Sequence, residues 1–235
     1  MIAAMLRVKN ESRWIERVIR SVQPVCERIV VMDDASTDGT AEICSSLGAE
    51  VLRSPFAGLD ETRDKNWLLA RVIRHSPEWI LCIDGDEELE QGGADKVRAV
   101  ARDRGIGACS LRVAYLWDSP DQVRTDGVYG RFARPSMFRA VTDARFRSTG
   151  NGGNFHCGNV PYGIGPTLRS EIRLLHYGYM ERADRVRKYE WYNRQDPNNY
   201  SEDLYRHMVI GDLFPADSQF RHGGPLKLET ICTAH

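Results

Sequence analysis

The sequence has no long apolar run, no strong excess of one charge and no patterned cysteines. The apolar residues 1–6 are followed at once by Arg7 and then by Lys9, so this stretch is too short for a membrane span or a signal-peptide core. The net charge is -1, which argues against a nucleic-acid binder that depends on bulk positive charge. We therefore expect a cytoplasmic protein with no transmembrane segment and no nucleic-acid partner, and peripheral contact with a membrane stays open.

The cysteines are few and scattered, and no CxxC pair occurs among them. Several lie inside apolar runs, which favours buried free thiols over a disulfide framework. A zinc site formed by His156, Cys157 and His176 is disfavoured as well, because their spacing matches no recurring zinc pattern. The six cysteines are Cys26, Cys44, Cys82, Cys109, Cys157 and Cys232.

The first half of the chain alternates short apolar runs with amphipathic stretches. The 235 residues, 42% hydrophobic and 28% charged, suffice for one globular domain with a full core. Alternating strands and helices predict an α/β fold with a mostly parallel sheet, in which ligands bind at the carboxyl ends of the strands. The pattern places strands at 2–8, 28–32, 50–52 and 79–83. It places one helix at 12–22, with Ser12 as its N-cap, a second helix that ends before Gly48, and a third at 60–74.

The second half is less regular. We expect a helix at 94–104, strands at 108–117 and 171–179, and a charged helix at 181–193. Residues 148–166 are rich in glycine and asparagine, which predicts a long loop of the kind that is usually functional in a compact domain. On the strand at 108–117, Tyr115 and Trp117 could stack against a sugar or belong to the core.

The strongest chemical signal is Asp84-Gly85-Asp86, directly after the apolar strand at 79–83. Two carboxylates separated by a glycine can turn toward one point, and Mg²⁺ or Mn²⁺ prefers such oxygen ligands. A solvated acidic turn before a helix would have the same residues, since acidic side chains also stabilise helix N-termini. The motif by itself leaves both interpretations open.

An acidic pair, Asp33-Asp34, stands at the end of an earlier predicted strand, 28–32. A carboxylate at such a strand end can accept hydrogen bonds from ribose hydroxyls or from a base. The alternative is helix capping, for which Asp38 is better placed than Asp34. Asp34 is therefore the better candidate for a ligand contact.

Basic residues on the helix at 60–74 and one histidine complete the set. Arg63, Lys65 and Asn66 could neutralise a diphosphate, with a solvated helix face as the alternative, above all for Lys65. His176 ends an apolar strand, where it could bind a metal or phosphate or be a structural histidine.

These segments, in this order, resemble family 2 glycosyltransferases of the GT-A fold. The resemblance covers roughly residues 2 to 195 and is dense up to Glu88. It implies a single GT-A domain over 1–235, with a nucleotide-sugar-binding half at 1–90, an acceptor-side half at 91–195 and a C-terminal extension at 196–235. The segments that carry it are Leu6-Arg7-Val8-Lys9-Asn10-Glu11, Val31 to Thr40 with its DD-S-DGT signature, Arg63-Asp64-Lys65-Asn66, Asp84-Gly85-Asp86-Glu87, and His176-Tyr177-Gly178-Tyr179 followed by Arg187-Lys188-Tyr189.

The resemblance implies an enzyme that moves a sugar from a nucleoside-diphosphate sugar, with UDP favoured, to a hydroxyl acceptor with inversion. The cofactor would be Mg²⁺ or Mn²⁺, and the metal would stabilise the leaving diphosphate. A glycan, a lipid-linked glycan or a small molecule would fit as acceptor, and the oligomeric state is open. The implied nucleotide-binding residues are Arg7, Asn10, Asp34, Arg63, Asp84 and Gly85, and the implied metal ligands are Asp86, Asp84 and His176.

One departure from the family concerns the general base that inverting members carry. Some relatives place a glutamate after a histidine in a V-H-E segment, whereas this chain has Phe155-His156-Cys157. His156 is our candidate for the base, acting with Asp86 in the catalytic site. The alternatives are Asp118, Asp126, Asp143 and Glu171.

Three other functions are compatible with parts of the pattern. A phosphotransfer hydrolase would carry its DxD motif on the first strand, followed by a threonine. A nucleotidyltransferase acting on sugar phosphates would need a glycine-rich loop after the first strand, where this chain has Val8-Lys9-Asn10-Glu11. A non-catalytic module that binds a nucleotide or carbohydrate would explain the missing glutamate. Turnover of a nucleotide sugar with metal distinguishes the transferase from the module.

Overall fold

The computed structural model describes residues 1–148 and 157–231, which divide into two compact units. Unit 1 contains Met1–Leu111 and Ala133–Arg173, and unit 2 contains Arg112–Phe132 and Leu174–His235. Each unit is thus built from two separate stretches of chain. The expectation of one domain divided at residues 90 and 195 stays a prediction.

Unit 1 contains the predicted parallel sheet. Its strands follow the spatial order β8-β4-β1-β2-β3, with β1, β2, β3 and β4 parallel and β8 antiparallel to β4. All four strands predicted in the first half are present, and the α/β architecture is confirmed. The strands are β1 (Ile2–Val8), β2 (Arg28–Asp33), β3 (Glu50–Arg53), β4 (Trp79–Cys82) and β8 (Ala133–Arg139).

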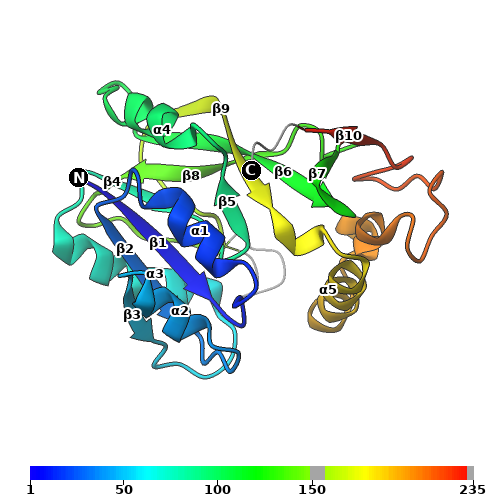
Figure 1. The fold of residues 1–235 in the computed structure, drawn as a ribbon, viewed down its shortest axis with the longest axis horizontal. Helices are drawn as coiled ribbons and strands as arrows, with labels where there is room; N and C mark the ends of the chain where they lie inside the picture. Colours follow the sequence, from blue (N-terminus) through cyan, green and yellow to red (C-terminus); the bar gives the residue numbers. More distant parts are fainter. Residues whose placement is uncertain (149–156, 232–235) are drawn as a thin grey trace. The chain divides into compact units, whose positions relative to one another are not determined.

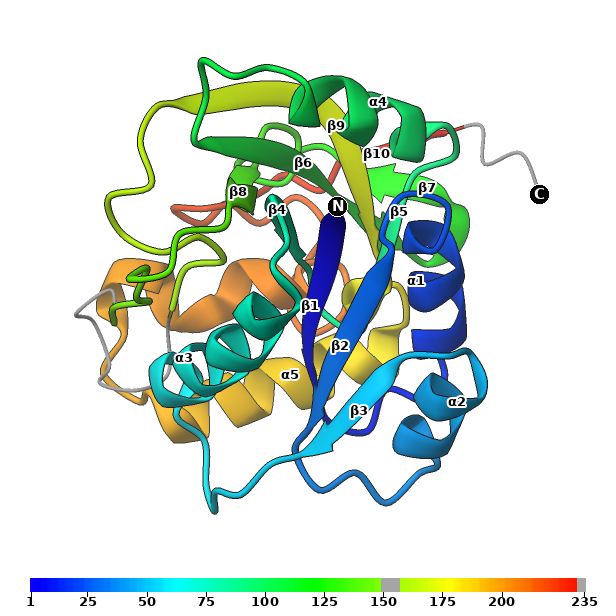
Figure 2. The ribbon, with the colours of Figure 1, turned by 90° about the vertical axis from the view of Figure 1, so that its left-hand side faces the viewer.

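Helices cover both faces of this sheet. α1 (Ile15–Val22) and α2 (Thr40–Ser46) lie on one face, and α3 (Glu61–Val72) lies on the other (Figure 2). Alternate residues of a strand point to opposite faces, so Met5 and Met32 pack with Leu68 of α3 in a buried cluster. This packing leaves the loops after β1, β2 and β4 at one edge of the sheet, because parallel strands end on the same side.

Helix α1 corrects one prediction. The helix begins at Ile15 after Trp14, and no side chain caps it, so Ser12 is not its N-cap. The backbone N–H of Ser12 instead donates to Asp38 Oδ2 at 3.0 Å. The loop before α1 is therefore tied to the loop after β2, a contact between distant residues that helix periodicity does not report.

Unit 1 also contains α4 (Gly93–Ala101), a short 3-10 helix (Ile73–His75), β5 (Glu87–Leu89) and the first parts of β6 (Ala108–Trp117) and β9 (Thr167–His176). β5 pairs with β9, and the backbone N–H of Glu90 donates to the carbonyl of Arg173 at 3.0 Å. The sequence did not predict β5 or β8. The residues of β5 are mostly acidic, and acidic residues are depleted in strands.

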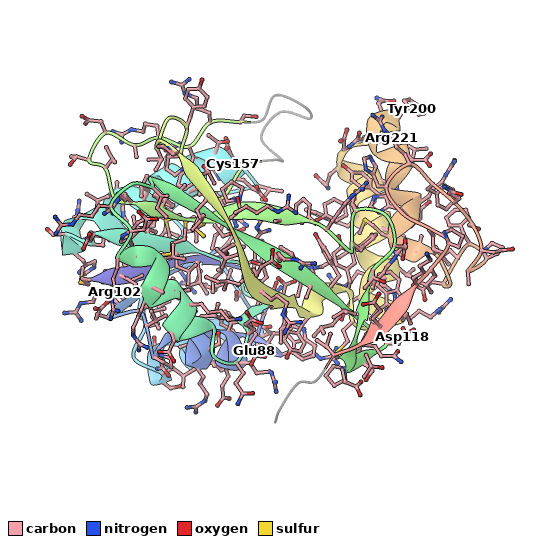
Figure 3. All side chains as sticks on the ribbon, turned by 90° about the horizontal axis from the view of Figure 1, so that it is seen from above. Glu88, Arg102, Asp118, Cys157, Tyr200 and Arg221 are labelled. Carbon is pink, nitrogen blue, oxygen red and sulfur yellow. The ribbon has the colours of Figure 1, made fainter. Side chains whose placement is uncertain are left out.

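Unit 2 contains the end of β6 (Ala108–Trp117), β7 (Ser119–Arg124) and β10 (Leu228–Thr230) in an antiparallel arrangement. Helix α5 (Arg182–Gln195) packs against the 3-10 helix at Tyr200–Val209 (Figure 1). Between these two helices, Tyr192 and Tyr205 stack with ring centroids 4.9 Å apart. Tyr200 begins that 3-10 helix and is exposed (Figure 3).

Trp117 lies in the core of unit 2. Its ring is covered by the guanidinium groups of Arg124 and Arg185, at 4.6 and 4.1 Å from the ring centroid. Only 1% of Trp117 is exposed, so it cannot stack on a sugar, and the core interpretation is correct for this residue.

The five described cysteines are free thiols, and all except Cys157 are buried. Cys232 lies outside the described residues. Within residues 1–148 and 157–231, no helix is long and apolar enough to cross a membrane. The cytoplasmic location stays a prediction.

Candidate active site

The loops that follow β1 and β2 are joined by hydrogen bonds. Asn10 adopts a left-handed conformation, with φ of 55°, and its Oδ1 accepts the backbone N–H of Thr37 at 2.9 Å. The backbone N–H of Asn10 donates to Ser36 Oγ at 2.9 Å, and that of Glu11 donates to Thr40 Oγ1 at 2.8 Å. The side-chain oxygen of Asn10 is therefore engaged in shaping the loop, and its contact with a nucleotide stays a prediction.

Asp38 has the structural role that the sequence favoured for it. Its Oδ1 accepts the backbone N–H of Thr40, the first residue of α2, at 3.1 Å. Burial alone would favour the neutral carboxyl, but hydrogen bonds from Thr40 and Ser12 outweigh it and lower the pKa of Asp38 to about 2. Asp38 stabilises the loop, which leaves Asp34 as the ligand candidate.

Arg7, Asp34, Asp64 and Arg63 form one charged network at the carboxyl edge of the sheet. Arg7 Nη2 donates to Asp34 Oδ2 at 2.8 Å, and Arg7 Nε donates to Asp64 Oδ2 at 2.8 Å. Arg63 Nε donates to Asp64 Oδ1 at 2.9 Å. The structure thus brings together three of the predicted nucleotide-binding residues through a carboxylate that the sequence had not singled out.

Arg63 is held at the edge of this network by further contacts. Its guanidinium lies 4.2 Å from the centroid of the Phe56 ring, and its Nη2 donates to the carbonyl of Gly58 at 2.8 Å. A third of its side chain is exposed, so the outer surface of the guanidinium remains accessible to a ligand. Arg63 fits an anionic group better than the two residues that follow Asp64.

Lys65 and Asn66 are engaged with backbone and are not available to a diphosphate. Lys65 is 7% exposed, and its Nζ donates to Cys157 O at 3.0 Å and Asn159 Oδ1 at 2.8 Å. Asn66 accepts the backbone N–H of Phe146 at 2.9 Å and donates to its carbonyl at 3.0 Å. The solvated-face interpretation of Lys65 is therefore wrong, because α3 packs against the segment 157–159.

Replacing Lys65 with methionine should lower the free energy of unfolding by about 1–3 kcal/mol, because the carbonyls of Cys157 and Gly158 and the side chain of Asn159 lose their donor. The matched control is Arg74→Met, which removes an exposed cation just beyond the same helix and should change stability by less than about 0.5 kcal/mol. Urea denaturation measures both. Equal effects of the two variants would show that the buried ammonium group contributes nothing.

The acidic turn after β4 contains three carboxylates of different exposure. Asp86 is 5% exposed and Glu87 1%, whereas 45% of the Asp84 side chain is exposed. Arg134 Nη2 donates to Asp84 Oδ2 at 3.0 Å and also to Glu87 Oε2. Burial raises the pKa of Glu87, and the nearby charges of Asp84 and Asp86 raise it further against the opposing effect of Arg134. Glu88, labelled in Figure 3, pairs with Arg17 at 3.0 Å beside this turn.

The chemistry of this turn fits a hard divalent cation. The turn concentrates negative charge where it is poorly solvated, as the raised pKa of Glu87 indicates, and a cation would relieve that charge. The described part of the chain contains no group of three or more His, Cys, Asp or Glu side chains that could hold a metal by themselves. Mg²⁺ commonly uses one or two carboxylates and takes its other ligands from water and substrate phosphates. Metal binding by Asp84 and Asp86 stays a prediction.

Gly85 lies against the end of β1. A Cβ atom at this position would be 2.8 Å from Glu11 Cγ and 3.0 Å from Val8 Cγ1, which is closer than carbon atoms approach. The glycine therefore allows the acidic turn to pack on the loop that carries Asn10. Its contact with a nucleotide stays a prediction.

Gly85→Ala should cost about 1–3 kcal/mol of stability, because Glu11 and Val8, or the acidic turn itself, must move to admit the methyl group. Gly158→Ala serves as control, since among the described residues a Cβ there would meet only Val160 O, at 3.8 Å. Thermal unfolding of both variants gives the comparison. A Gly85→Ala protein as stable as the control would mean that the turn has space that the structure does not show.

His176 belongs to unit 2, whereas Asp84 and Asp86 belong to unit 1. It is 8% exposed and lies among aromatic rings, with its ring centroid 5.2 Å from that of Tyr115 and 5.1 Å from that of Tyr179. Tyr115 is half-buried in this aromatic cluster. Metal binding by His176 stays a prediction.

The candidates for the general base differ in their burial and hydrogen bonding. His156 lies outside the described residues. Asp126 is buried and accepts hydrogen bonds from Arg124 at 2.7 and 2.8 Å and from the backbone of Gly224 and Lys227, so it is a structural carboxylate. Asp118 accepts from Arg185 Nη2 at 2.7 Å. Asp143 and Glu171 are exposed.

Sequence reasoning missed the roles of Asp64 and Arg134. Asp64 stood inside the Arg63-Asp64-Lys65-Asn66 segment, and its helical position beside Arg63 was the only signal for it. Arg134 is 50 residues from Asp84 in the chain and has no motif around it. Its place in the site depends on the antiparallel pairing of β8 with β4.

Comparison with known proteins identifies the pattern of the first 160 residues. The model of the family described as glycosyl transferase family 2 matches residues 5–160. An uncharacterised glycosyltransferase of Rickettsia bellii is 37% identical over 99 residues, which are 42% of this chain and 32% of that protein. The match thus spans about a third of the length of this relative. An uncharacterised protein of Mycobacterium tuberculosis is 27% identical over 246 residues, which cover 95% of this chain and 60% of that protein.

Two solved structures are among those that resemble this chain. Glucosyl-3-phosphoglycerate synthase from Mycobacterium tuberculosis, solved with Mn²⁺ and UDP, matches with a TM-score of 0.38 and 24% identity over 49% of this chain and 44% of that chain. TarS from S. aureus, solved with UDP-GlcNAc, matches with a TM-score of 0.48 and 14% identity over 62% of this chain and 48% of that chain.

Proposed function

The chain belongs to glycosyl transferase family 2, and from this premise we propose that it transfers a sugar from a nucleoside-diphosphate sugar to a hydroxyl acceptor. UDP is the nucleotide we favour, Mg²⁺ or Mn²⁺ the cofactor, and inversion the stereochemical outcome. The observation that carries the proposal is the edge of the unit 1 sheet, where Arg7, Asp34 and Arg63 form one network at the same strand ends as the acidic turn.

In this proposal the network after β1 and β2 binds the nucleoside diphosphate. Arg7 Nη2 donates to Oδ2 of Asp34, and Oδ1 would accept from a ribose hydroxyl or a base N–H. Arg63 would donate to the diphosphate through its exposed edge. Asn10 and Gly85 would shape the backbone around the nucleotide.

Asp86 and Asp84 would hold the divalent cation. The cation, when bound, would neutralise charge that develops on the leaving diphosphate. Arg134 Nη2 contacts Asp84 and Glu87, so it orients the acidic turn and limits repulsion among its carboxylates. The acceptor hydroxyl would lose its proton to a base, for which His156 is the candidate.

Turnover of nucleotide sugars tests the proposal. The purified chain is incubated with UDP-glucose, UDP-N-acetylglucosamine and GDP-mannose, with Mg²⁺, with Mn²⁺ or with EDTA, and release of the nucleoside diphosphate is measured. We expect release that depends on metal and on one donor. Metal-dependent binding without release or transfer would favour a non-catalytic module instead. Uptake of label from a nucleoside triphosphate and a sugar phosphate would favour a nucleotidyltransferase.

Asp34→Ala should raise the donor KM by about tenfold and change kcat by less than about threefold, because it removes uniform binding of the nucleoside. Steady-state kinetics with varied donor separates the two constants. Ser46→Ala, an exposed change on α2, is the control. An unchanged KM in Asp34→Ala would remove this residue from the donor site.

A further inference from the structure

Asp64 is the most enclosed carboxylate of the unit 1 network. Its side chain is fully buried, on the first turn of α3 directly after Arg63. Oδ2 accepts from Arg7 Nε at 2.8 Å, and Oδ1 accepts from Arg63 Nε at 2.9 Å. Arg63 Nη2 also lies 2.8 Å from Oδ1, in an ion pair. Each oxygen therefore fixes one arginine, and the two arginines come from different elements of the sheet edge.

Asp64 offsets part of the positive charge of the network. Arg7, Lys9 and Arg63 supply three cations, while Asp34 and Asp64 supply two carboxylates, and Lys9 lies 3.6 Å from Asp34. The surplus of one positive charge suits an anionic ligand. Without Asp64, two guanidinium groups would face the same buried space and repel each other, so both would have to turn away.

The remaining donors follow from this arrangement. Asp64 engages Nε of Arg7, whose Nη2 then reaches Asp34. It pairs with Nε and Nη2 of Arg63, whose guanidinium carbon lies over the Phe56 ring, 4.2 Å from its centroid. Because a guanidinium is rigid and planar, fixing its Nε side fixes the direction of its remaining N–H groups.

We propose that Asp64 is a positioning residue, which orients Arg7 and Arg63 toward the nucleoside diphosphate of the donor without touching it. The inference rests on the proposed function, since it assigns the network to the donor side. Asp64 then controls donor affinity through two arginines at once.

The test is Asp64→Asn, which keeps the size of the side chain and replaces one acceptor oxygen with an amide that cannot accept from a guanidinium. Donor KM should rise by about tenfold or more, with kcat within about threefold of wild type. The affinity for the nucleoside diphosphate, measured by calorimetry with UDP and with GDP, should fall in parallel.

Glu90→Gln is the matched control. Glu90 is another buried carboxylate of unit 1 that pairs with two cations, Lys96 at 2.7 Å and Arg173 at 2.8 Å. The Glu90→Gln variant should have a lower melting temperature than wild type and an unchanged donor KM. Equal KM effects in Asp64→Asn and Glu90→Gln would reduce Asp64 to a structural residue and overturn the proposal.

A double-mutant comparison adds a readout that a purely structural role would not move. In an Arg7→Met/Arg63→Met background, Asp64→Asn should change UDP affinity by less than about twofold, because the two arginines through which Asp64 acts on the ligand are absent. An undiminished effect in that background contradicts the proposal.

If Asp64→Asn does not fold, Arg7→Met/Asp64→Asn removes one cation together with the carboxylate charge. Compared with Arg7→Met alone, it should still raise donor KM, through Arg63, and no further rise overturns the proposal. The proposed function fails separately: in that case wild type itself binds neither UDP nor GDP and turns over no nucleotide sugar.

Discussion

Replacing Asp86 with alanine should abolish metal-dependent transfer while the fold stays intact. The side chain is 5% exposed at the acidic turn after β4, beside Asp84 and Glu87, so its removal takes away a carboxylate from the proposed metal site. Loss of electrostatic stabilisation at a developing charge reduces kcat by about 10²-fold or more. The fold should survive, because one fewer negative charge relieves repulsion with the neighbouring carboxylates.

Steady-state kinetics over a series of Mn²⁺ concentrations measures this effect, and circular dichroism checks the fold. The control is Asp95→Ala, which removes an exposed carboxylate of α4 that is paired with Arg98 at the surface. Asp95→Ala should retain the activity of wild type. Full activity of Asp86→Ala in excess metal would show that the metal site lies elsewhere.

Asp126→Asn should destabilise unit 2 by about 3–5 kcal/mol, because it leaves the buried guanidinium of Arg124 without its counter-charge. Both side chains are almost completely buried, and the same carboxylate accepts backbone N–H groups of Gly224 and Lys227. Urea denaturation followed by tryptophan fluorescence measures the loss, since Trp117 lies against Arg124. Asp121→Asn, an exposed change on β7, should shift stability by less than about 0.5 kcal/mol.

The pH dependence of stability gives a second measure of Asp126. Burial alone would raise its pKa, but hydrogen bonds and charge from Arg124 hold it below the ordinary 3.8. A lowered pKa contributes stability that is present above pH 3.8 and is lost as the pH falls through the folded value. Wild type should therefore lose more stability than Asp126→Asn in that acidic range. Parallel pH profiles of the two proteins would contradict the assignment.

Some strands and helices could be predicted from the sequence, and others could not. The strands at 2–8 and 28–32 were predictable, because buried parallel strands read as unbroken apolar runs. The spacing of Ile15, Val18 and Ile19 gave the buried face of α1 for the same local reason. Strand β5 was not predictable, because its acidic residues disfavour strands and only pairing with β9 makes it one.

The roles of the polar residues were also only partly predictable from the sequence. Asp34 and Arg63 were identified from motifs, and the structure joins them to Arg7 in one network. Lys65 and Trp117 carried residue types that suit a ligand, but Lys65 binds backbone carbonyls and Trp117 lies between two arginines. Residue type alone cannot separate a ligand contact from a structural one, because both use the same hydrogen-bonding groups.

By itself the sequence determined the alternation of strands and helices, the edge of the sheet where polar residues gather, and the family. The strands and helices follow from patterns within about ten residues, since burial on one face sets the period of each element. The family followed from the resemblance of short motifs to those of known glycosyltransferases. Only the tertiary structure decided which polar groups make hydrogen bonds or ion pairs within the protein. Asp64 meets Arg7 across 57 residues and Lys65 meets Asn159 across 94, and such pairs form only when packing brings distant segments together.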